Sequence, residues 1–497
     1  MESKLPKNWV DTEVGIISEI IRGITYNKLQ AKSIKKNDDY LVLRGGNIQD
    51  GKITTKTNDV VYVESNLVKE IQKIKKGDVV IVGSTGSKRL IGKAGIAKED
   101  FKEISFGAFL MLIRPSYLIN KTLFDYYFIS DNYRNVIREL AGGVNINNIR
   151  REYITNLNFP LPPLAEQQRI VAKLDTLFGS LDALKIRLNN IPQLIKNFKQ
   201  AVLTQAVTGK LTQEWRVGKE LEYVNTVVKE FLTDLVEKEK SLTKKKKIKA
   251  LIKEKSFKEF KIPEEWTFFK LDKLCLEFTY GSSSKSLNEG LVPVLRMGNL
   301  QDGKIDWEKL KYSIDEKEIK KYLLSKGDVL FNRTNSPELV GKTALYSGEK
   351  KALYAGYLIK IKNGEVLNSS YLNYVLNSPY AKEWSWKVKT DGVSQSNINA
   401  QKLSQFNLPF PPKEEQTEIV KRVENLFSKA DAIEKQYKTL KEKIDRLPQA
   451  ILAKAFKGEL VAQLPTDGDA KDLLEEIKKL KESLVVKPKK KVVRKKK

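Results

Sequence analysis

The stretch Pro162-Pro163-Leu164-Ala165-Glu166-Gln167-Gln168-Arg169-Ile170-Val171 returns later in the chain as Pro411-Pro412-Lys413-Glu414-Glu415-Gln416-Thr417-Glu418-Ile419-Val420. The offset between the two copies then stays constant, without a gap, as far as Leu211 and Leu460. A repeat of this length predicts two similar halves related by a pseudo-two-fold axis.

Each copy continues into a segment in which apolar residues are spaced alternately by four and three. This is the heptad pattern of a coiled coil, and it predicts two long helices that pair antiparallel. The alternative is that each is an amphipathic helix packed on its own domain. Pro192 and Pro448 are expected to kink or divide these helices. The predicted interface residues are Leu174, Leu177, Leu181, Leu184 and Leu188 in the first copy and Val423, Leu426, Ile433, Leu440 and Ile444 in the second.

The repeat also extends upstream, where residues 43–53 match 295–305 and residues 76–79 match 326–329. Short β-rich stretches are separated by Gly-Asp, Asp-Gly and Asn-Gly turns, and helices are expected around residues 121–138 and 370–387. The predicted fold class is therefore α+β, with two mixed domains joined by two long antiparallel coiled-coil helices. The expected segments are a mixed domain at 1–160, a helical region at 161–214, a lysine-rich linker at 215–262, a second mixed domain at 263–409, a second helical region at 410–464, and a helical segment with a basic tail at 465–497.

The composition narrows the possible functions. The 497 residues include 90 Lys and Arg against 62 Asp and Glu, a net charge of +28, and a chain this basic favours a polyanionic partner such as duplex DNA. Histidine is absent, which removes the commonest general base and metal ligand. The single Cys275 excludes a disulfide framework and fits a reducing cytoplasm. No membrane span or secretory signal is expected.

Motifs of catalysis are incomplete. Gly341-Lys342-Thr343 resembles the end of a phosphate-binding loop, but Ser336 stands where that loop requires a glycine. No dinucleotide-binding motif and no Asn/Asp-Pro-Pro-aromatic motif of adenine methyltransferases is present. These observations predict a chain with no catalytic residues, no metal ligands and no cofactor of its own.

The ordered set of motifs, occurring twice, resembles the specificity subunits of type I restriction–modification systems. The residues that carry the resemblance are 161–170 and 410–416, with Gly209-Lys-Leu-Thr-Gln-Glu-Trp215-Arg216 and Gly458-Glu-Leu-Val461 closing the two helical regions. It covers nearly the whole chain except the lysine-rich linker and the extreme tail.

The resemblance implies that each mixed domain is a target recognition domain that reads one half of a bipartite, asymmetric DNA site. It implies that the helical regions set the spacing between the halves and dock two methyltransferase subunits. Restriction/translocase subunits would join for cleavage, and S-adenosylmethionine, ATP and magnesium would be bound by these partner subunits. The chain itself would be a non-catalytic, cytoplasmic DNA-recognition subunit.

The two mixed domains differ most between their shared fixed points, where residues 83–90 correspond to 332–339. Arg and Lys can pair with guanine edges and Asn with adenine, so the candidates for base readout are Lys88, Arg89, Arg333 and Asn335. Each could equally belong to an ordinary polar surface loop. The candidates for sequence-independent phosphate contacts recur in both halves and are Arg44, Lys52, Arg296 and Lys304.

Two other functions stay open. The chain could be a fused methyltransferase or nuclease, which the missing motifs disfavour. It could also be a non-specific DNA-binding coiled-coil scaffold, which the non-identical duplicated domains disfavour.

Overall fold

A computed structural model describes all residues except 1–4, 37, 57–59, 143–146 and 485–497. The chain divides into two compact units. The first unit combines Met1–Leu188 with Thr439–Lys497, and the second comprises Asn189–Lys438. The last part of the chain therefore completes the unit in which the chain begins. The basic tail from residue 487 lies outside the described residues.

A four-stranded antiparallel sheet forms the centre of the first unit, in the order β2 (Ser18–Arg22), β11 (Leu110–Pro115), β7 (Val79–Val82) and β9 (Ala94–Ile96). All four residues of β7 are buried, as expected for a central strand made only of β-branched residues. A second sheet has the order β10 (Ile104–Phe106), β3 (Tyr40–Leu43) and β6 (Tyr62–Val63). The other strands of this unit are β1 (Val10–Glu13), β4 (Ile48–Gln49), β5 (Lys52–Ile53), β8 (Ser84–Thr85), β12 (Asn147–Asn148) and β13 (Asn158–Leu161).

The second unit has a corresponding strand order. Its four-stranded sheet runs β15 (Cys275–Tyr280), β24 (Leu358–Asn363), β20 (Val329–Asn332) and β22 (Thr343–Leu345). A three-stranded sheet is formed by β19 (Lys311–Ser313), β16 (Val292–Leu295) and β23 (Leu353–Tyr354). The other strands of this unit are β14 (Thr267–Lys270), β17 (Leu300–Gln301), β18 (Lys304–Ile305), β21 (Thr334–Asn335), β25 (Thr390–Asp391), β26 (Ser396–Asn397) and β27 (Asn407–Phe410).

Each helix expected within a mixed domain is in fact two helices. In the first unit α2 (Lys121–Phe128) is followed by α3 (Asp131–Leu140), and in the second unit α12 (Ser369–Asn377) is followed by α13 (Pro379–Val388). The breaks arise at Ser130 and Ser378, whose hydroxyls accept hydrogen bonds from backbone amides in the first turn of the following helix. The short helices are α1 (Val14–Ile17), α4 (Arg151–Thr155), α7 (Gln213–Arg216), α10 (Leu271–Leu274), α11 (Glu316–Tyr322) and α14 (Ala400–Ser404).

Three long helices follow the repeated Pro-Pro motifs. The first copy gives α5 (Leu164–Asn189) and α6 (Ile191–Val207), whereas the second gives a single α15 (Lys413–Phe456). Pro192 divides the first copy as predicted, because it lies in the first turn of α6, where the missing amide costs no hydrogen bond. Pro448 lies inside α15 and does not divide it, so at this position the alternative expectation of a kink stays a prediction.

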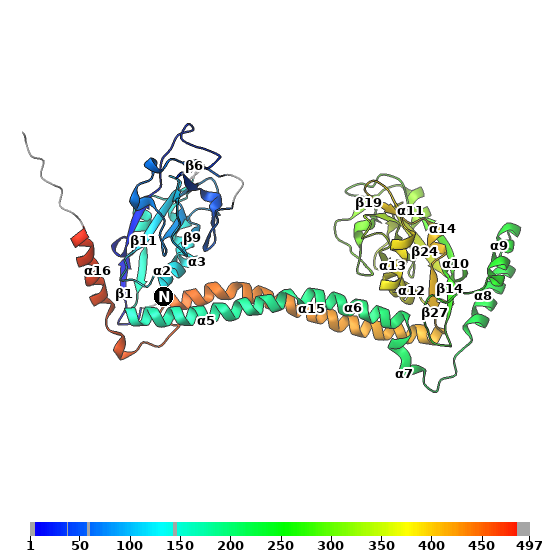
Figure 1. The fold of residues 1–497 in the computed structure, drawn as a ribbon. Helices are drawn as coiled ribbons and strands as arrows, with labels where there is room; N and C mark the ends of the chain where they lie inside the picture. Colours follow the sequence, from blue (N-terminus) through cyan, green and yellow to red (C-terminus); the bar gives the residue numbers. More distant parts are fainter. Residues whose placement is uncertain (1–4, 37, 57–59, 143–146, 485–497) are drawn as a thin grey trace, which may run out of the picture. The chain divides into compact units, whose positions relative to one another are not determined.

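Within each unit, parts of the long helices pack on each other. In the first unit Ile170 and Leu174 of α5 share a core cluster with Leu452 and Ala455 near the end of α15. In the second unit α6 contributes Val202 and Leu203 to the cluster that contains Ile419 and Val423, near the start of α15. Figure 1 shows α5 beside the last part of α15 and α6 beside its first part. The helix pairs within each unit are therefore antiparallel.

Helices from the linker and from the C-terminal segment cover the mixed domains. In the second unit α8 (Val224–Lys238) packs Phe231 against Gly364, and the lysine-rich α9 (Leu242–Lys253) follows it. In the first unit α16 (Ala470–Leu484) contributes Leu474 and Ile477 to the core. The lysine-rich linker is thus largely helical in this structure.

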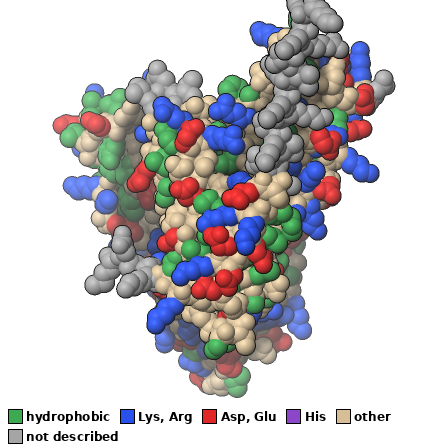
Figure 2. Space-filling model, turned by 90° about the vertical axis from the view of Figure 1, so that its left-hand side faces the viewer, with side chains coloured by type: hydrophobic (Ala, Val, Ile, Leu, Met, Phe, Trp, Pro, Cys, Tyr) green, Lys and Arg blue, Asp and Glu red, His purple; other side chains and the backbone are tan. Residues whose placement is uncertain are grey.

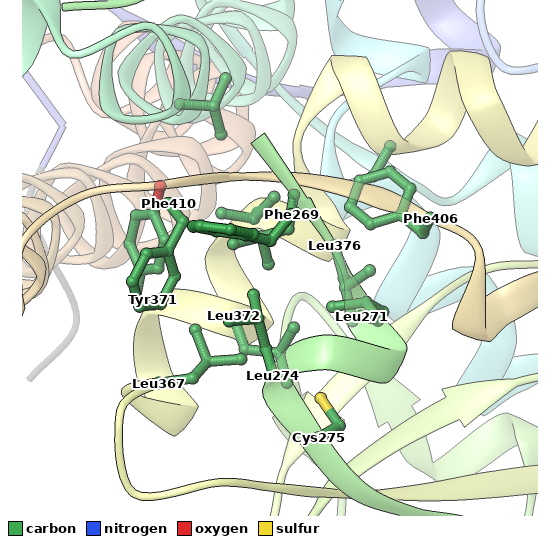
Figure 3. Packing of buried hydrophobic residues seen from close by; sticks show 14 of the residues in the cluster. Phe269, Leu271, Leu274, Cys275, Leu367, Tyr371, Leu372, Leu376, Phe406 and Phe410 are labelled. Atoms are coloured by element: carbon green, nitrogen blue, oxygen red, sulfur yellow. The ribbon is translucent and has the colours of Figure 1, made fainter. Parts of the chain in front are cut away.

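The second unit's core joins sheet, short helices and long helices. Figure 3 shows Phe269 of β14, Tyr371 of α12 and Phe410 of β27 packed together beside the leucines of α10 and α12, with Cys275 at the edge. Burial raises the pKa of the Cys275 thiol, so this side chain is a packing residue and a poor nucleophile.

Candidate nucleic-acid interface

The Glu-Gln pair of each repeated motif fixes a long helix to its mixed domain. Gln167 is fully buried; its Oε1 accepts a hydrogen bond from the backbone N of Asn120 (2.9 Å), and its Nε2 donates to the carbonyl of Pro162 (2.8 Å). Gln416 makes the same two contacts, with Asn368 N at 2.7 Å and Pro411 O at 3.0 Å. The motif is therefore a structural joint, because its amide ties the first turn of the helix to the cap of α2 or α12.

The neighbouring glutamates are buried acceptors. Glu166 accepts from Trp9 Nε1 at 2.9 Å and from Gln463 Nε2 at 3.0 Å. Glu415 accepts from Trp266 Nε1 at 2.7 Å and also forms an ion pair with Arg216. The motif that closes the first helical region thus supplies the cation for the second joint.

The base-readout candidates lie in equivalent hairpins after β7 and β20. Lys88 and Arg89 are exposed, and the carbonyl of Arg89 accepts a hydrogen bond from Arg134 Nη2 at 2.8 Å. The Arg333 guanidinium lies over the Tyr280 ring at 4.5 Å from its centroid, and its Nη1 donates to Gly356 O at 3.4 Å. Asn335 lies in β21 and accepts a hydrogen bond from the amide of Ser336. Both second-unit side chains are only partly exposed.

The phosphate candidates occupy matching turns. Arg44 and Arg296 precede short 3-10 turns, and their backbone amides donate to the side chains of Asn47 and Asn299. The Arg296 guanidinium also donates to the Lys309 carbonyl at 3.2 Å. Lys52 and Lys304 are both exposed. Lys304 pairs with Asp431 of α15 at 3.4 Å, so this lysine links the mixed domain of the second unit to its long helix.

The predicted coiled-coil residues are buried to different extents. Leu174, Leu181 and Leu188 are buried in the first copy, as are Val423 and Ile444 in the second. Leu177 and Leu426 are half-buried, whereas Leu184, Ile433 and Leu440 are exposed by 45%, 52% and 46%. One of the two heptad positions is therefore deeply packed, and the coiled coil itself remains a prediction.

A basic cavity of about 480 Å³ in the first unit was not anticipated from sequence. It contains Arg134 and Arg138, which stand one turn apart on α3, with Arg89 and Lys93 from the hairpin after β7. Burial and the neighbouring Arg138 lower the pKa of the Arg134 guanidinium. The i, i+4 pair of arginines was the available sequence signal, but only the fold brings it to the hairpin.

On one face of the molecule, charges of both signs are mixed. Figure 2, a view from the left-hand side of Figure 1, shows Lys and Arg interspersed with Asp and Glu. That face therefore has no extended patch of a single sign. Among the described residues there is no group of three or more His, Cys, Asp or Glu side chains suited to a metal ion. No helix in that part of the chain is long and apolar enough to cross a membrane.

Comparison with known proteins identifies the family. Residues 6–193 and 263–442 match the model of the type I restriction modification DNA specificity domain. The chain is 36% identical over 490 residues to the type I restriction enzyme EcoKI specificity subunit of Escherichia coli K12, with 96% of each chain covered. It is 34% identical to the StySPI specificity subunit of Salmonella potsdam, covering 93% of this chain and 91% of that protein.

The fold has a counterpart among solved structures. The HsdS subunit of Thermoanaerobacter tengcongensis superimposes with a TM-score of 0.57 at 18% identity, covering 92% of this chain and 99% of that one. Two separate matches to the domain model and full-length relatives above 30% identity lead to one conclusion: the chain belongs to the family of type I restriction–modification specificity subunits.

Proposed function

We propose that this chain is the DNA sequence-specificity subunit of a type I restriction–modification complex and is itself non-catalytic. Each mixed domain is a target recognition domain that reads one half of a bipartite, asymmetric site in duplex DNA. The long helices set the spacing between the halves and dock two methyltransferase subunits. Restriction subunits complete the complex, and the partner subunits bind S-adenosylmethionine, ATP and magnesium. The complex works in the cytoplasm.

One observation carries this proposal: the two units share a strand order but differ in their hairpins. Residues 83–90 and 332–339 each connect the central strand to the edge strand of a four-stranded sheet. Arg89 in the first hairpin corresponds to Glu338 in the second, and Thr85 corresponds to Asn335. A common framework with unlike loops supports the reading of two different half-sites.

The test is an exchange of residues 83–90 for the equivalent loop of another family member. The variant is assembled with its methyltransferase subunits, and the methylated adenines are mapped on random-sequence DNA. One half-site should change while the other half and the spacing stay as in the parent complex. Simultaneous change in both halves would contradict modular reading, and methylation without sequence preference would favour the non-specific scaffold.

The ruler role of the helices has a separate test. Inserting one heptad into α5 and one into α15 keeps the buried positions in phase. The spacer of the methylated site should lengthen while both half-sites stay the same. An unaltered spacer would remove the ruler role and leave the recognition role intact. Assembly of the variant with the methyltransferase subunits serves as the control for folding.

A further inference from the structure

The basic cavity of the first unit carries more positive than negative charge. We call it the Arg134 pocket. Four cationic side chains line it, whereas the carboxylates on its wall come from two aspartates. The cations are Arg89, Lys93, Arg134 and Arg138; the aspartates are Asp50 and Asp131; the remaining wall includes Phe128, Ile129 and Gln449.

The cations are poorly neutralised. Arg134 is only 9% exposed, yet its ion pair is long, with Nη1 at 3.7 Å from Asp50 Oδ1. The same carboxylate also forms an ion pair with Lys93, whose Nζ lies 3.9 Å from Asp50 Oδ2. The Asp50 side chain is 81% exposed, so solvent weakens both pairs. Within the described residues, the buried Nε atoms of Arg134 and Arg138 have no hydrogen-bond partner.

A guanidinium does not escape this situation by losing its proton, because its pKa stays too high in proteins. A buried charge with spare N–H donors is costly unless an anion accepts its hydrogen bonds. The forked donors of arginine suit the oxygens of a phosphoryl group, and the pocket is open to the exposed Arg89. The pocket therefore has the charge and the donors for such a ligand.

The second unit lacks an equivalent. Ser130 and Ser378 cap α3 and α13, which places Lys382 at the position of Arg134 and Trp386 at that of Arg138. Glu338 replaces Arg89. Lys382 donates to the Gln200 amide at 3.0 Å, and such a contact satisfies the ammonium without an anion. The pair of arginines on α3, facing a third arginine on the hairpin, is thus a property of the first unit.

We infer that the Arg134 pocket binds a phosphoryl group, and that this group is a backbone phosphate of the DNA bound by the first recognition domain. The second part of the inference rests on the proposed function. It assigns Arg89 a contact with the DNA backbone in place of base readout. It also makes the first domain the one whose binding depends more strongly on salt.

The test uses the full chain, a labelled duplex containing the recognised site and Arg138→Gln. Arg138 is chosen because its bond to the Arg89 carbonyl is long, at 3.5 Å, whereas Arg134 anchors the hairpin. Fluorescence anisotropy gives the affinity at several salt concentrations. The slope of log K against log salt should fall in magnitude by about 0.9 for the lost contact, equally on matched and mismatched duplexes. Lys102→Gln, an exposed lysine away from the pocket, is the control for charge alone.

A second arm titrates inorganic phosphate and pyrophosphate into the same proteins by calorimetry. Suppose that these anions bind the parent chain but not Arg138→Gln, while the salt dependence of DNA binding is the same for both proteins. The pocket would then be a phosphoryl site, but its ligand would be a free phosphate compound and not the DNA backbone. Equal behaviour of Arg138→Gln and Lys102→Gln in both arms would overturn the inference. If the parent chain bound no DNA, the proposed function would fail. The calorimetric titration would still show whether the pocket binds a phosphoryl group.

Discussion

The buried carboxyl of Asp125 should make the stability of the first unit depend on pH. Asp125 lies on α2, and its Oδ1 is buried with no hydrogen-bond partner among the described residues. Desolvation raises the pKa of this carboxyl from 3.8 to about 8, although Lys98 and Lys121 oppose the shift. The corresponding residue of the second unit is Asn373, a neutral side chain of the same shape.

The sign follows from proton binding. Between pH 4 and 8 the folded unit keeps a proton that the unfolded chain has released, so raising the pH destabilises the folded state. Each pH unit costs about 1.4 kcal/mol, or about 2.7 kcal/mol between pH 5 and 7. Asp125→Asn removes this dependence. The amide also mimics Asn373, whose Nδ2 donates to the Gly303 carbonyl at 2.8 Å.

Hydrogen exchange of peptides from α2 and α3, corrected for the intrinsic rate, measures the effect in one unit at a time. Protection should fall about 100-fold from pH 5 to 7 in the parent chain, which is the same free energy expressed as a ratio. The fall should be much smaller in Asp125→Asn. Peptides of the second unit are an internal control, and Asp131→Asn, on the exposed side of α3, is the matched variant.

Two results would refute this reasoning. Equal pH dependence in the parent chain and Asp125→Asn would show that the carboxyl is ionised in the folded state. A pH dependence that disappears equally in Asp131→Asn would assign it to surface charge. The reciprocal variant Asn373→Asp should create the same dependence in the second unit, because it places a carboxyl on the Gly303 carbonyl.

Three further outcomes are expected from single substitutions. Gln167→Ala should destabilise the first unit by about 1–3 kcal/mol in urea unfolding, because it leaves buried backbone groups unpaired, whereas the exposed Gln168→Ala should be neutral. Arg216→Gln should destabilise the second unit by about 3 kcal/mol, followed by tryptophan fluorescence, because Glu415 stays buried without its cation; a change below 0.5 kcal/mol would argue against a buried ion pair. Arg333→Ala should weaken DNA binding by about 1–3 kcal/mol in a manner that depends on base identity, and equal weakening on every duplex would make Arg333 a phosphate contact or a packing residue.

Much of the architecture follows from local sequence patterns. The repeat indicated two related halves, and the spacing of apolar residues indicated long helices after each Pro-Pro motif. These features can be predicted from sequence because a helical face and a turn depend on residues close together in the chain. The helix boundaries inside residues 121–138 were less accessible, since Ser130 caps a new helix within an otherwise helical stretch.

The candidate site was only partly predictable. Hairpins 83–90 and 332–339 stood out because they differ within a shared frame. The roles of their side chains depend on neighbours far along the chain, as when Arg333 stacks on Tyr280. Arg134 reaches the Arg89 carbonyl only because α3 packs beside the hairpin. Those candidates remain predictions about DNA contact.

The sequence by itself determined that the chain is duplicated and basic, that it contains no histidine, and that the two hairpins differ between shared flanking residues. Only the tertiary structure decided which segments complete each unit. The first unit includes the described residues 439–484. They are held to it by the ion pair of Arg169 with Asp467 and by the hydrogen bond that Gln463 donates to Glu166. The physical reason is that a buried polar group requires a partner of matching geometry, and nothing in local spacing specifies one about 300 residues away.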